Sequence, residues 1–102
     1  MQGIIENNRQ QIIDLCKKHK VSTFYLFGSA IRNEMKKNSD IDFLVTFSSS
    51  IPLLDYSDNY FSLKFALEDL LKNPVDLVSF KSLKNPILLE EINNSKVELY
   101  AA

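Results

Sequence analysis

The sequence predicts an α/β sandwich in one domain, in which helices alternate with three or four strands of a small sheet. Two kinds of apolar spacing alternate along its 102 residues. One repeats every three to four residues, as in amphipathic helices, and the other is continuous or alternating, as in strands. The length suits a single core, and no repeat, linker or low-complexity tract divides residues 1–102.

The first predicted element is a helix between Gly3 and His19, with lysines near its end, where the helix dipole favours cations. Its apolar residues at roughly helical spacing are Ile5, Ile12, Leu15 and Cys16. A buried strand should follow from Val21 to Phe27, because a β-branched and aromatic run stops there at a glycine. The letters AIRNEM then allow a short helix behind Ser29.

The second predicted strand is Ile41–Phe47, whose residues alternate between two faces of the chain. One face carries Ile41, Phe43, Val45 and Phe47, and the other carries Asp42, Leu44 and Thr46. After a polar loop over Ser48–Pro52, helical spacing predicts a long helix that ends near Asn73–Pro74. A third strand should cover Val75–Phe80.

The last predicted helix begins at Asn85–Pro86, since proline suits a first helical turn. The letters VELYA after it predict an edge strand or a docked tail. Cys16 is the only cysteine, which excludes a disulfide framework and favours a reducing compartment, with the thiol in the core.

Charge and hydropathy argue against nucleic-acid and membrane partners. The 12 basic and 13 acidic residues nearly cancel, so no broad basic surface is expected to hold DNA or RNA. No apolar run approaches the roughly 20 residues that span a membrane, and the first residues lack the pattern of a secretory signal. We therefore expect a cytoplasmic protein without a membrane or nucleic-acid partner.

Three aspartates form a candidate metal site. Asp40 and Asp42 are two residues apart, so in a strand they would project the same way, about 6 to 7 Å from one another. Mg²⁺ prefers carboxylate, phosphate and water oxygens, and two ions about 3.5 to 4 Å apart clamp the oxygens of a nucleotidyl transfer. Asp76 interrupts the third strand and would complete a triad if that strand neighbours the second. A buried acid needs such a partner, because its desolvation is costly.

A candidate phosphate-binding turn precedes these acids. Gly28 lets the backbone approach a phosphate closely, and a helix start behind it offers free N–H groups to an anion. Ser29 can add its hydroxyl, and Arg32, one turn further, can point a guanidinium at the same phosphates. Each feature alone has a structural explanation as a turn or a helix cap, but their combination in one small domain favours a site.

The stretch LFGSAIRNEMKKNSDIDFLV resembles the G-S, ten residues, D-x-D motif of the DNA polymerase beta superfamily. Within that superfamily it is most similar to the minimal nucleotidyltransferases, the MNT domains of HEPN/MNT toxin-antitoxin pairs. Arg32 matches the arginine of the family's G-S-x-A-R-G run, Ser39–Asp42 matches S-D-I-D, and NPVDLV matches the strand with the third acid, Asp76. Ile31 and Asn33 depart from the usual alanine and glycine.

The resemblance implies a polymerase-beta-like nucleotidyltransferase fold and Mg²⁺-dependent transfer of AMP from ATP to a hydroxyl. In that scheme Asp40 and Asp42 hold both metal ions, while Asp76 helps to hold the catalytic ion and could assist deprotonation of the acceptor. The triphosphate would be held by Gly28, Ser29 and Arg32. The implied partner is a HEPN ribonuclease toxin whose tyrosine accepts AMP, which makes this chain the antitoxin.

Two other functions fit the same residues. A non-catalytic antitoxin would neutralise its partner by binding alone, although three intact acids favour an enzyme. A catalytic subunit of a two-chain transferase would modify a small molecule held by a helical partner, and nothing in the sequence separates this acceptor from a protein.

Two further features have weaker functional claims. The long helix carries aromatic residues on more than one face, namely Tyr56, Tyr60, Phe61 and Phe65. Core packing explains most of them, and a leftover patch would suit a protein interface. His19 lacks cysteine or histidine companions, so we expect a capping or surface role rather than a metal ligand.

Overall fold

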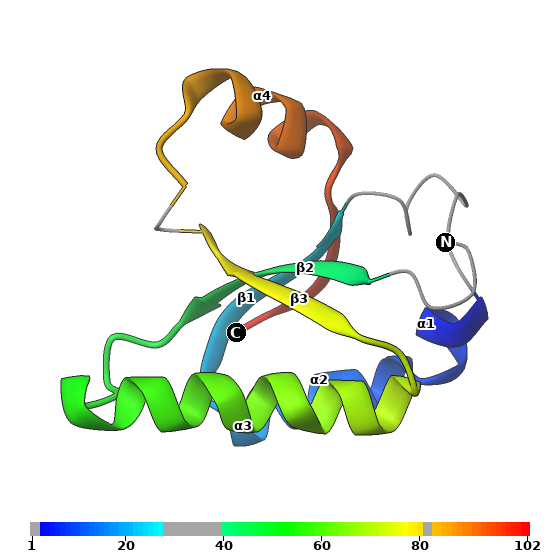
Figure 1. Ribbon diagram of the computed structural model, residues 1–102, viewed down its shortest axis with the longest axis vertical. Helices are drawn as coiled ribbons and strands as arrows, with labels where there is room; N and C mark the ends of the chain where they lie inside the picture. Colours follow the sequence, from blue (N-terminus) through cyan, green and yellow to red (C-terminus); the bar gives the residue numbers. More distant parts are fainter. Residues whose placement is uncertain (1–2, 28–39, 81–82) are drawn as a thin grey trace.

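The computed structural model describes residues 3–27, 40–80 and 83–102, and these fold around a four-stranded sheet (Figure 1). The strands are β1 (Val21–Phe27), β2 (Ile41–Phe47), β3 (Val75–Ser79) and β4 (Val97–Ala101). Their order is β3-β2-β1-β4, with β2 and β3 parallel and the other neighbours antiparallel. The predicted α/β class with a small mixed sheet is confirmed.

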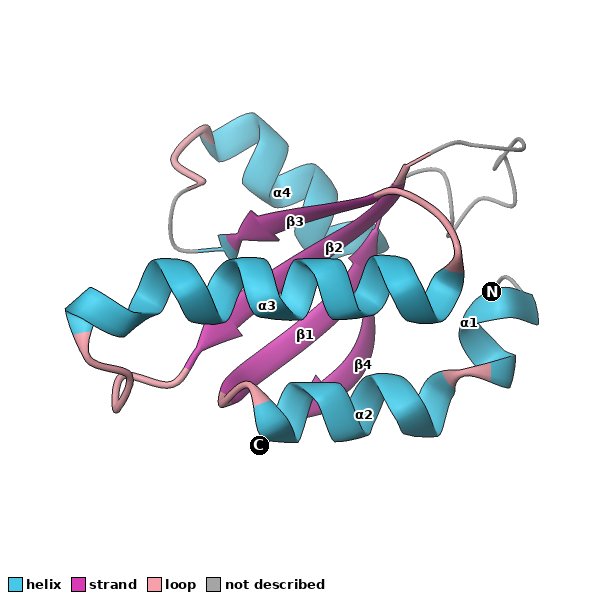
Figure 2. Ribbon diagram, turned by 60° about the horizontal axis from the view of Figure 1, so that its bottom comes forward, coloured by secondary structure: helices cyan, strands magenta, loops and turns pink. Residues whose placement is uncertain are grey.

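Helices cover both faces of this sheet. They are α1 (Gly3–Asn7), α2 (Arg9–Lys18), α3 (Leu53–Leu71) and α4 (Pro86–Ser95). Figure 2 shows α2 and α3 side by side in front of the sheet and α4 behind it. None of the helices in the described ranges is both long and apolar enough to cross a membrane.

The main core lies between the sheet and the helices α2 and α3. Of the two faces that the sequence distinguishes in β2, the one with Ile41, Phe43, Val45 and Phe47 points into this core, because all four residues are buried. Phe43 stacks on Phe24 of β1 with 4.7 Å between ring centroids. Cys16 is buried in this core as predicted, and burial raises the pKa of its thiol to about 12. Leu44 is also fully buried, although it lies on the opposite face of β2 with Asp42.

The first predicted helix is in fact two helices, which meet at Asn8. The backbone of Asn8 leaves the helical region, with φ of −115° and ψ of 14°. Its side-chain Nδ2 donates a hydrogen bond to the carbonyl of Ile4 at 2.8 Å. An asparagine side chain can thus replace a helical hydrogen bond, which explains the break. Ile5 and Ile12, on either side of it, still enter the same core.

His19 caps α2 and joins it to α3. Its backbone N–H donates to the carbonyl of Leu15, and its ring Nδ1–H donates to the same oxygen at 2.8 Å. The other ring nitrogen, Nε2, lies 3.0 Å from the hydroxyl of Ser62, from which it accepts in the neutral ring. The predicted capping role is confirmed, whereas a surface position is wrong because the side chain is buried.

The remaining boundaries are close to the predicted ones. The long helix ends at Leu71, where Lys72 adopts a left-handed backbone with φ of 55°. The third strand stops at Ser79, one residue before the predicted end. The letters VELYA form an edge strand, β4, which pairs with β1. The short helix predicted over AIRNEM lies outside the described residues.

Candidate functional site

Asp42 and Asp76 lie next to each other on adjacent strands. They are direct Cα partners in the parallel pair of β2 and β3. The register is fixed where β2 begins, because the N–H of Ile41 donates to the carbonyl of Pro74 at 2.9 Å. On the other side of β2, Asp42 is the Cα partner of Phe27, the last residue of β1. The condition set by the sequence, that the third strand should neighbour the second, is confirmed.

The environment of Asp42 raises the pKa of its carboxyl group. Partial burial is the largest cause, followed by the negative charges of Asp76 and Asp40 and a hydrogen bond with the Asp76 side chain. Asp40 itself is exposed and lies just before β2 rather than within it. The structure therefore brings the three predicted acids into one electrostatic group, with Asp42 in its middle.

The chemistry of this group suits a hard cation. Its donors are carboxylate oxygens, which Mg²⁺ prefers, and a divalent ion between them would relieve the repulsion that, after partial burial, raises the pKa of Asp42. Within the described ranges, however, no three Asp, Glu, His or Cys side chains are already closed into a metal-binding set. Asp40, Asp42 and Asp76 would thus have to draw together around an ion.

The predicted phosphate-binding residues Gly28, Ser29 and Arg32 lie outside the described residues. They remain predictions for the triphosphate.

Two side chains of α3 hold β3 in place on either side of Asp76. Glu68 Oε2 accepts the backbone N–H of Val75 at 2.9 Å and the Lys64 ammonium at 3.2 Å. The hydroxyl of Tyr60 donates to the carbonyl of Leu77. Sequence reasoning missed both contacts, because Glu68 with Lys64 resembles an ordinary surface pair of a helix and Tyr60 resembles a packing residue.

Glu68→Gln should lower the melting temperature at pH 7. The hydrogen bond from the Val75 N–H, followed by the interaction with Lys64, lowers the pKa of Glu68. The contribution of the Glu68 carboxylate to stability is therefore present above its unfolded-state pKa and is lost as pH falls through its folded-state pKa. Thermal melts of both proteins from pH 7 to pH 3 measure this, and the difference between them should shrink toward acid. A difference that is constant with pH would contradict the assigned charge interaction.

An apolar groove runs along the outer edge of β3, beside the contacts that Glu68 and Tyr60 make with this strand. It has a volume of about 480 Å³. It is lined by Tyr56, Ser57, Tyr60 and Phe61 of α3 and by Leu77, Val78 and Ser79. The pKa of the Tyr60 hydroxyl is raised, first by partial burial and then by the negative charge of Asp76. The second cause links Tyr60 to the acid group. The groove and the acids are therefore neighbours.

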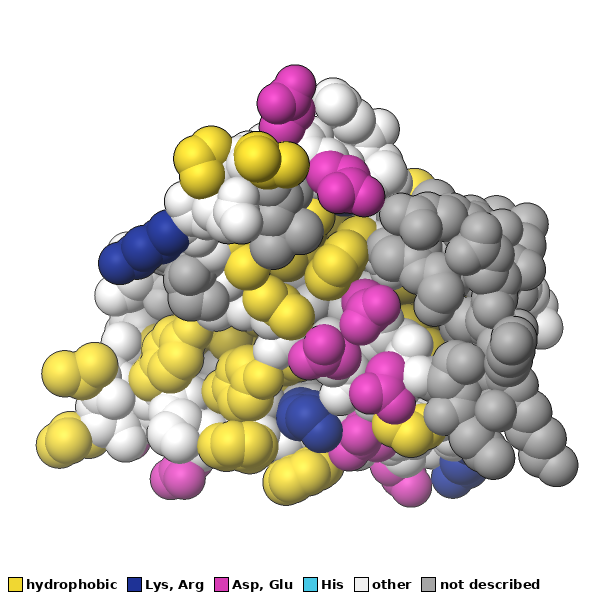
Figure 3. Space-filling model, turned by 45° about the horizontal axis from the view of Figure 1, so that its top comes forward, with side chains coloured by type: hydrophobic (Ala, Val, Ile, Leu, Met, Phe, Trp, Pro, Cys, Tyr) yellow, Lys and Arg dark blue, Asp and Glu magenta, His cyan; other side chains and the backbone are white. Residues whose placement is uncertain are grey.

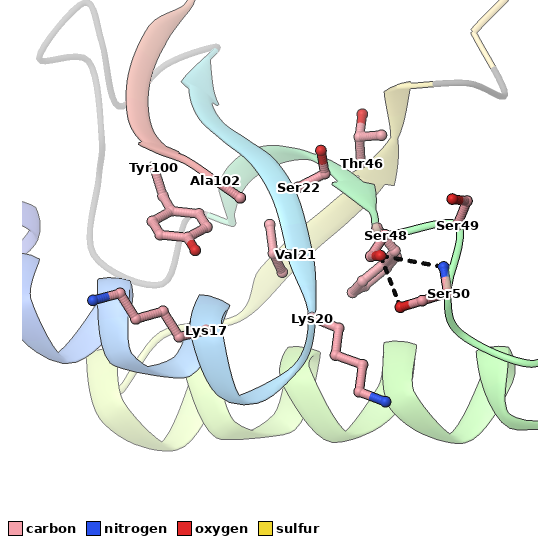
Figure 4. Close-up of a pocket in the computed structure, with 11 residues that line it drawn as sticks. Lys17, Lys20, Val21, Ser22, Thr46, Ser48, Ser49, Ser50, Tyr100 and Ala102 are labelled. Atoms are coloured by element: carbon pink, nitrogen blue, oxygen red, sulfur yellow. Dashed lines mark hydrogen bonds between the residues drawn. The ribbon is translucent and has the colours of Figure 1, made fainter.

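A separate hollow lies at the far end of β2 (Figure 4). Hydroxyl groups gather there, and Ser48 and Ser50 share a hydrogen bond of 2.9 Å between their Oγ atoms. Lys17 and Lys20 lie at its rim, and Figure 4 shows their ammonium groups pointing away from each other. Because Asp42 is at the opposite end of β2, this hollow is not part of the acid site.

Comparisons with known proteins agree with this geometry. The family model described as polymerase beta, nucleotidyltransferase matches residues 10–102. A protein of Methanocaldococcus jannaschii, described as a candidate protein adenylyltransferase, is 38% identical over 95 residues, which cover 93% of this chain and 97% of that one.

Two solved structures share the fold. A candidate minimal nucleotidyltransferase is 35% identical with a TM-score of 0.73, and the match covers 91% of this chain and 90% of that chain. A toxin-antitoxin complex with AMP-PNP contains a chain that is 27% identical with a TM-score of 0.71, and the match covers 93% and 74% of the two chains.

Proposed function

Since this chain belongs to the polymerase beta nucleotidyltransferase family, we propose that it transfers AMP from ATP to a hydroxyl group of a partner protein. The observation that carries this proposal is the pairing of Asp42 with Asp76 on adjacent strands, with the charge of Asp40 beside them. Two acids in register with a third nearby provide the negative centre that a nucleotidyl transfer needs.

Asp40 and Asp42 would hold two Mg²⁺ ions, and Asp76 would share one of them. Bound Mg²⁺ would supply Lewis-acid stabilisation of charge on the phosphate oxygens. Asp76 would also accept the proton of the acceptor hydroxyl, because it lies at the free edge of the group, on the edge strand β3. The acceptor oxygen then forms a bond to the α-phosphorus, and the bond from that phosphorus to the bridging oxygen breaks. Pyrophosphate leaves with those electrons.

The proposed acceptor is a tyrosine of a HEPN ribonuclease toxin, and this chain would act as its antitoxin. The sequence resemblance to MNT domains supports this partner, as does the similarity to a chain in a toxin-antitoxin complex that contains an ATP analogue. The open form of the groove beside Asp76 also suits an acceptor carried on another chain. Gly28, Ser29 and Arg32 are proposed to bind the triphosphate.

Labelled ATP tests this function directly. The chain is incubated with Mg²⁺ and the product of the neighbouring gene, once with α-labelled and once with γ-labelled ATP. We expect covalent label on the partner only from the α-phosphate, because adenylylation retains that phosphate and releases the other two. Mass spectrometry should then locate the added AMP on a tyrosine.

Other outcomes separate the alternatives. Transfer of the γ-phosphate would indicate a kinase. Neutralisation of the partner without label from either nucleotide would favour the contact-only antitoxin, particularly if Asp40→Asn still neutralised it. Label on an added small molecule instead of the protein would favour the two-chain transferase.

A further inference from the structure

The outer face of α3 exposes large apolar side chains that the core does not use. Phe61 and Phe65 are 47% and 59% exposed, and Leu53 and Leu54 near the start of the helix are 89% and 93% exposed. Figure 3 shows hydrophobic side chains spread over the lower part of this view, next to a group of carboxylates. Contiguous apolar surface of this kind is characteristic of a contact site for another macromolecule.

The aromatic residues of this face already have fixed positions relative to one another. The rings of Tyr60 and Phe61 meet edge to face with 5.0 Å between centroids, and Phe61 stacks on Phe65 at 5.9 Å. The Lys64 ammonium lies 5.5 Å from the centroid of the Phe65 ring. Rings that are held by their neighbours lose little entropy on binding, so they make good anchors at a protein interface.

The groove along β3 connects this face to the acids. Its β3 wall begins at Leu77, the residue after Asp76, and ends at Ser79, roughly 7 Å further along the strand. Its α3 wall includes Phe61. A polypeptide seated on the aromatic face could therefore continue through the groove and end with a hydroxyl at the acid group.

The chemistry of the groove selects among possible occupants. Among the residues that the structure describes, hydroxyl, aromatic and aliphatic side chains line it, and none of these residues is charged. A triphosphate needs cations, so the nucleotide is a poor occupant. A second copy of this chain would gain apolar contact, but only an acceptor gains from the position beside Asp76.

We infer that this groove and the adjoining aromatic face of α3 dock the acceptor protein, through an apolar segment that lies next to the hydroxyl to be modified. This inference rests on the proposed function, because it assigns the surface that supplies that function's second substrate. Phe61 is its central anchor, since it lines the groove and also contacts both Tyr60 and Phe65. It is a docking residue and not a catalytic one.

Phe61→Ser tests the inference, with Ile87→Ser as the matched control. Ile87 is 78% exposed on α4, so the control removes an exposed apolar side chain from another helix. With the partner protein that accepts AMP in the labelling experiment, Phe61→Ser should raise KM for that protein at least tenfold and leave kcat at saturation unchanged. Calorimetry should show the same loss of affinity for that protein. Ile87→Ser should change neither quantity.

The outcomes of docking and of catalysis are distinguishable. Transfer by Phe61→Ser with an unchanged KM would overturn the docking surface and leave the proposed function standing. If the wild-type chain binds the partner but transfers no label, the proposed function fails, while weaker binding by Phe61→Ser still supports docking. A wild-type dimer that Phe61→Ser converts to a monomer would assign the surface to a second copy and overturn the inference. A circular dichroism spectrum and an ATP-induced thermal shift like those of the wild type show that the variant is folded.

Discussion

Replacing Asp42 with asparagine is expected to lower AMP transfer by about 10³-fold, or roughly 4 kcal/mol of transition-state stabilisation. The amide has nearly the shape of the carboxylate, so β2 and its register with β3 should remain. It carries no negative charge to hold a metal ion, so the loss should fall on the reaction. The assay is the transfer of α-label to the partner protein, with circular dichroism on the same sample. Retained transfer would mean that the acid pair is not the reacting centre.

Although Asp42→Asn should lower activity, it should raise the stability of the metal-free domain. The pKa of Asp42 is raised in the folded chain, first by partial burial and then by its acidic neighbours. Its contribution to stability is therefore present below the unfolded-state pKa and is lost as pH rises through the folded-state pKa. At pH 7 and without metal, Asp42→Asn should melt at a higher temperature than the wild type. Asp58→Asn, at an exposed position on α3, serves as the control and should lack this gain.

The second large effect is joint stabilisation by Mg²⁺ and nucleotide. A ligand that binds only the folded state at 100 times its Kd adds about 2.7 kcal/mol, which for a domain of this size corresponds to an upward shift of roughly 10 °C or more. Mg²⁺ with a non-hydrolysable ATP analogue should produce this shift, whereas either alone should do less. A thermal-shift assay at millimolar ligand measures it, and no shift would count strongly against the site.

This stabilisation should depend on pH. Protons compete with the metal ion for a carboxyl group of raised pKa, so the shift should grow as pH rises from 5 to 8. In Asp42→Asn the shift should be small at every pH. A wild-type shift that is the same at pH 5 and pH 8 would contradict a role for the acid group in metal binding.

Much of the fold was predictable from local chemistry. The strands Val21–Phe27 and Ile41–Phe47 have their predicted bounds, because β-branched and aromatic runs are sharply punctuated there. The break at Asn8 was not predictable, since asparagine fits a helix surface as well as a helix end and only its contact with Ile4 decides. Leu44 is a similar case, because it is buried although it shares the second face of β2 with Asp42, and alternation along the strand does not show that this face is covered.

The candidate site also combines features that local sequence predicts with features that depend on the whole fold. Spacing alone placed Asp40 near Asp42, but the register that sets Asp42 opposite Asp76 depends on strand order, which is a long-range property. The excess of aromatic residues on the long helix was visible in the sequence. Which of them would remain exposed depended on how the helix rotates against the sheet and on the position of β3 at its edge.

The two contacts from α3 to β3 have a consequence for how the chain associates. An edge strand with free backbone groups is a template for another strand, and this leads to aggregation by sheet extension. Here the Val75 N–H and the Leu77 carbonyl already bond to Glu68 and Tyr60. An incoming strand would first have to displace both side chains. The edge nearest the acids is thereby protected from indiscriminate β-augmentation, and partners must be recognised there by their side chains.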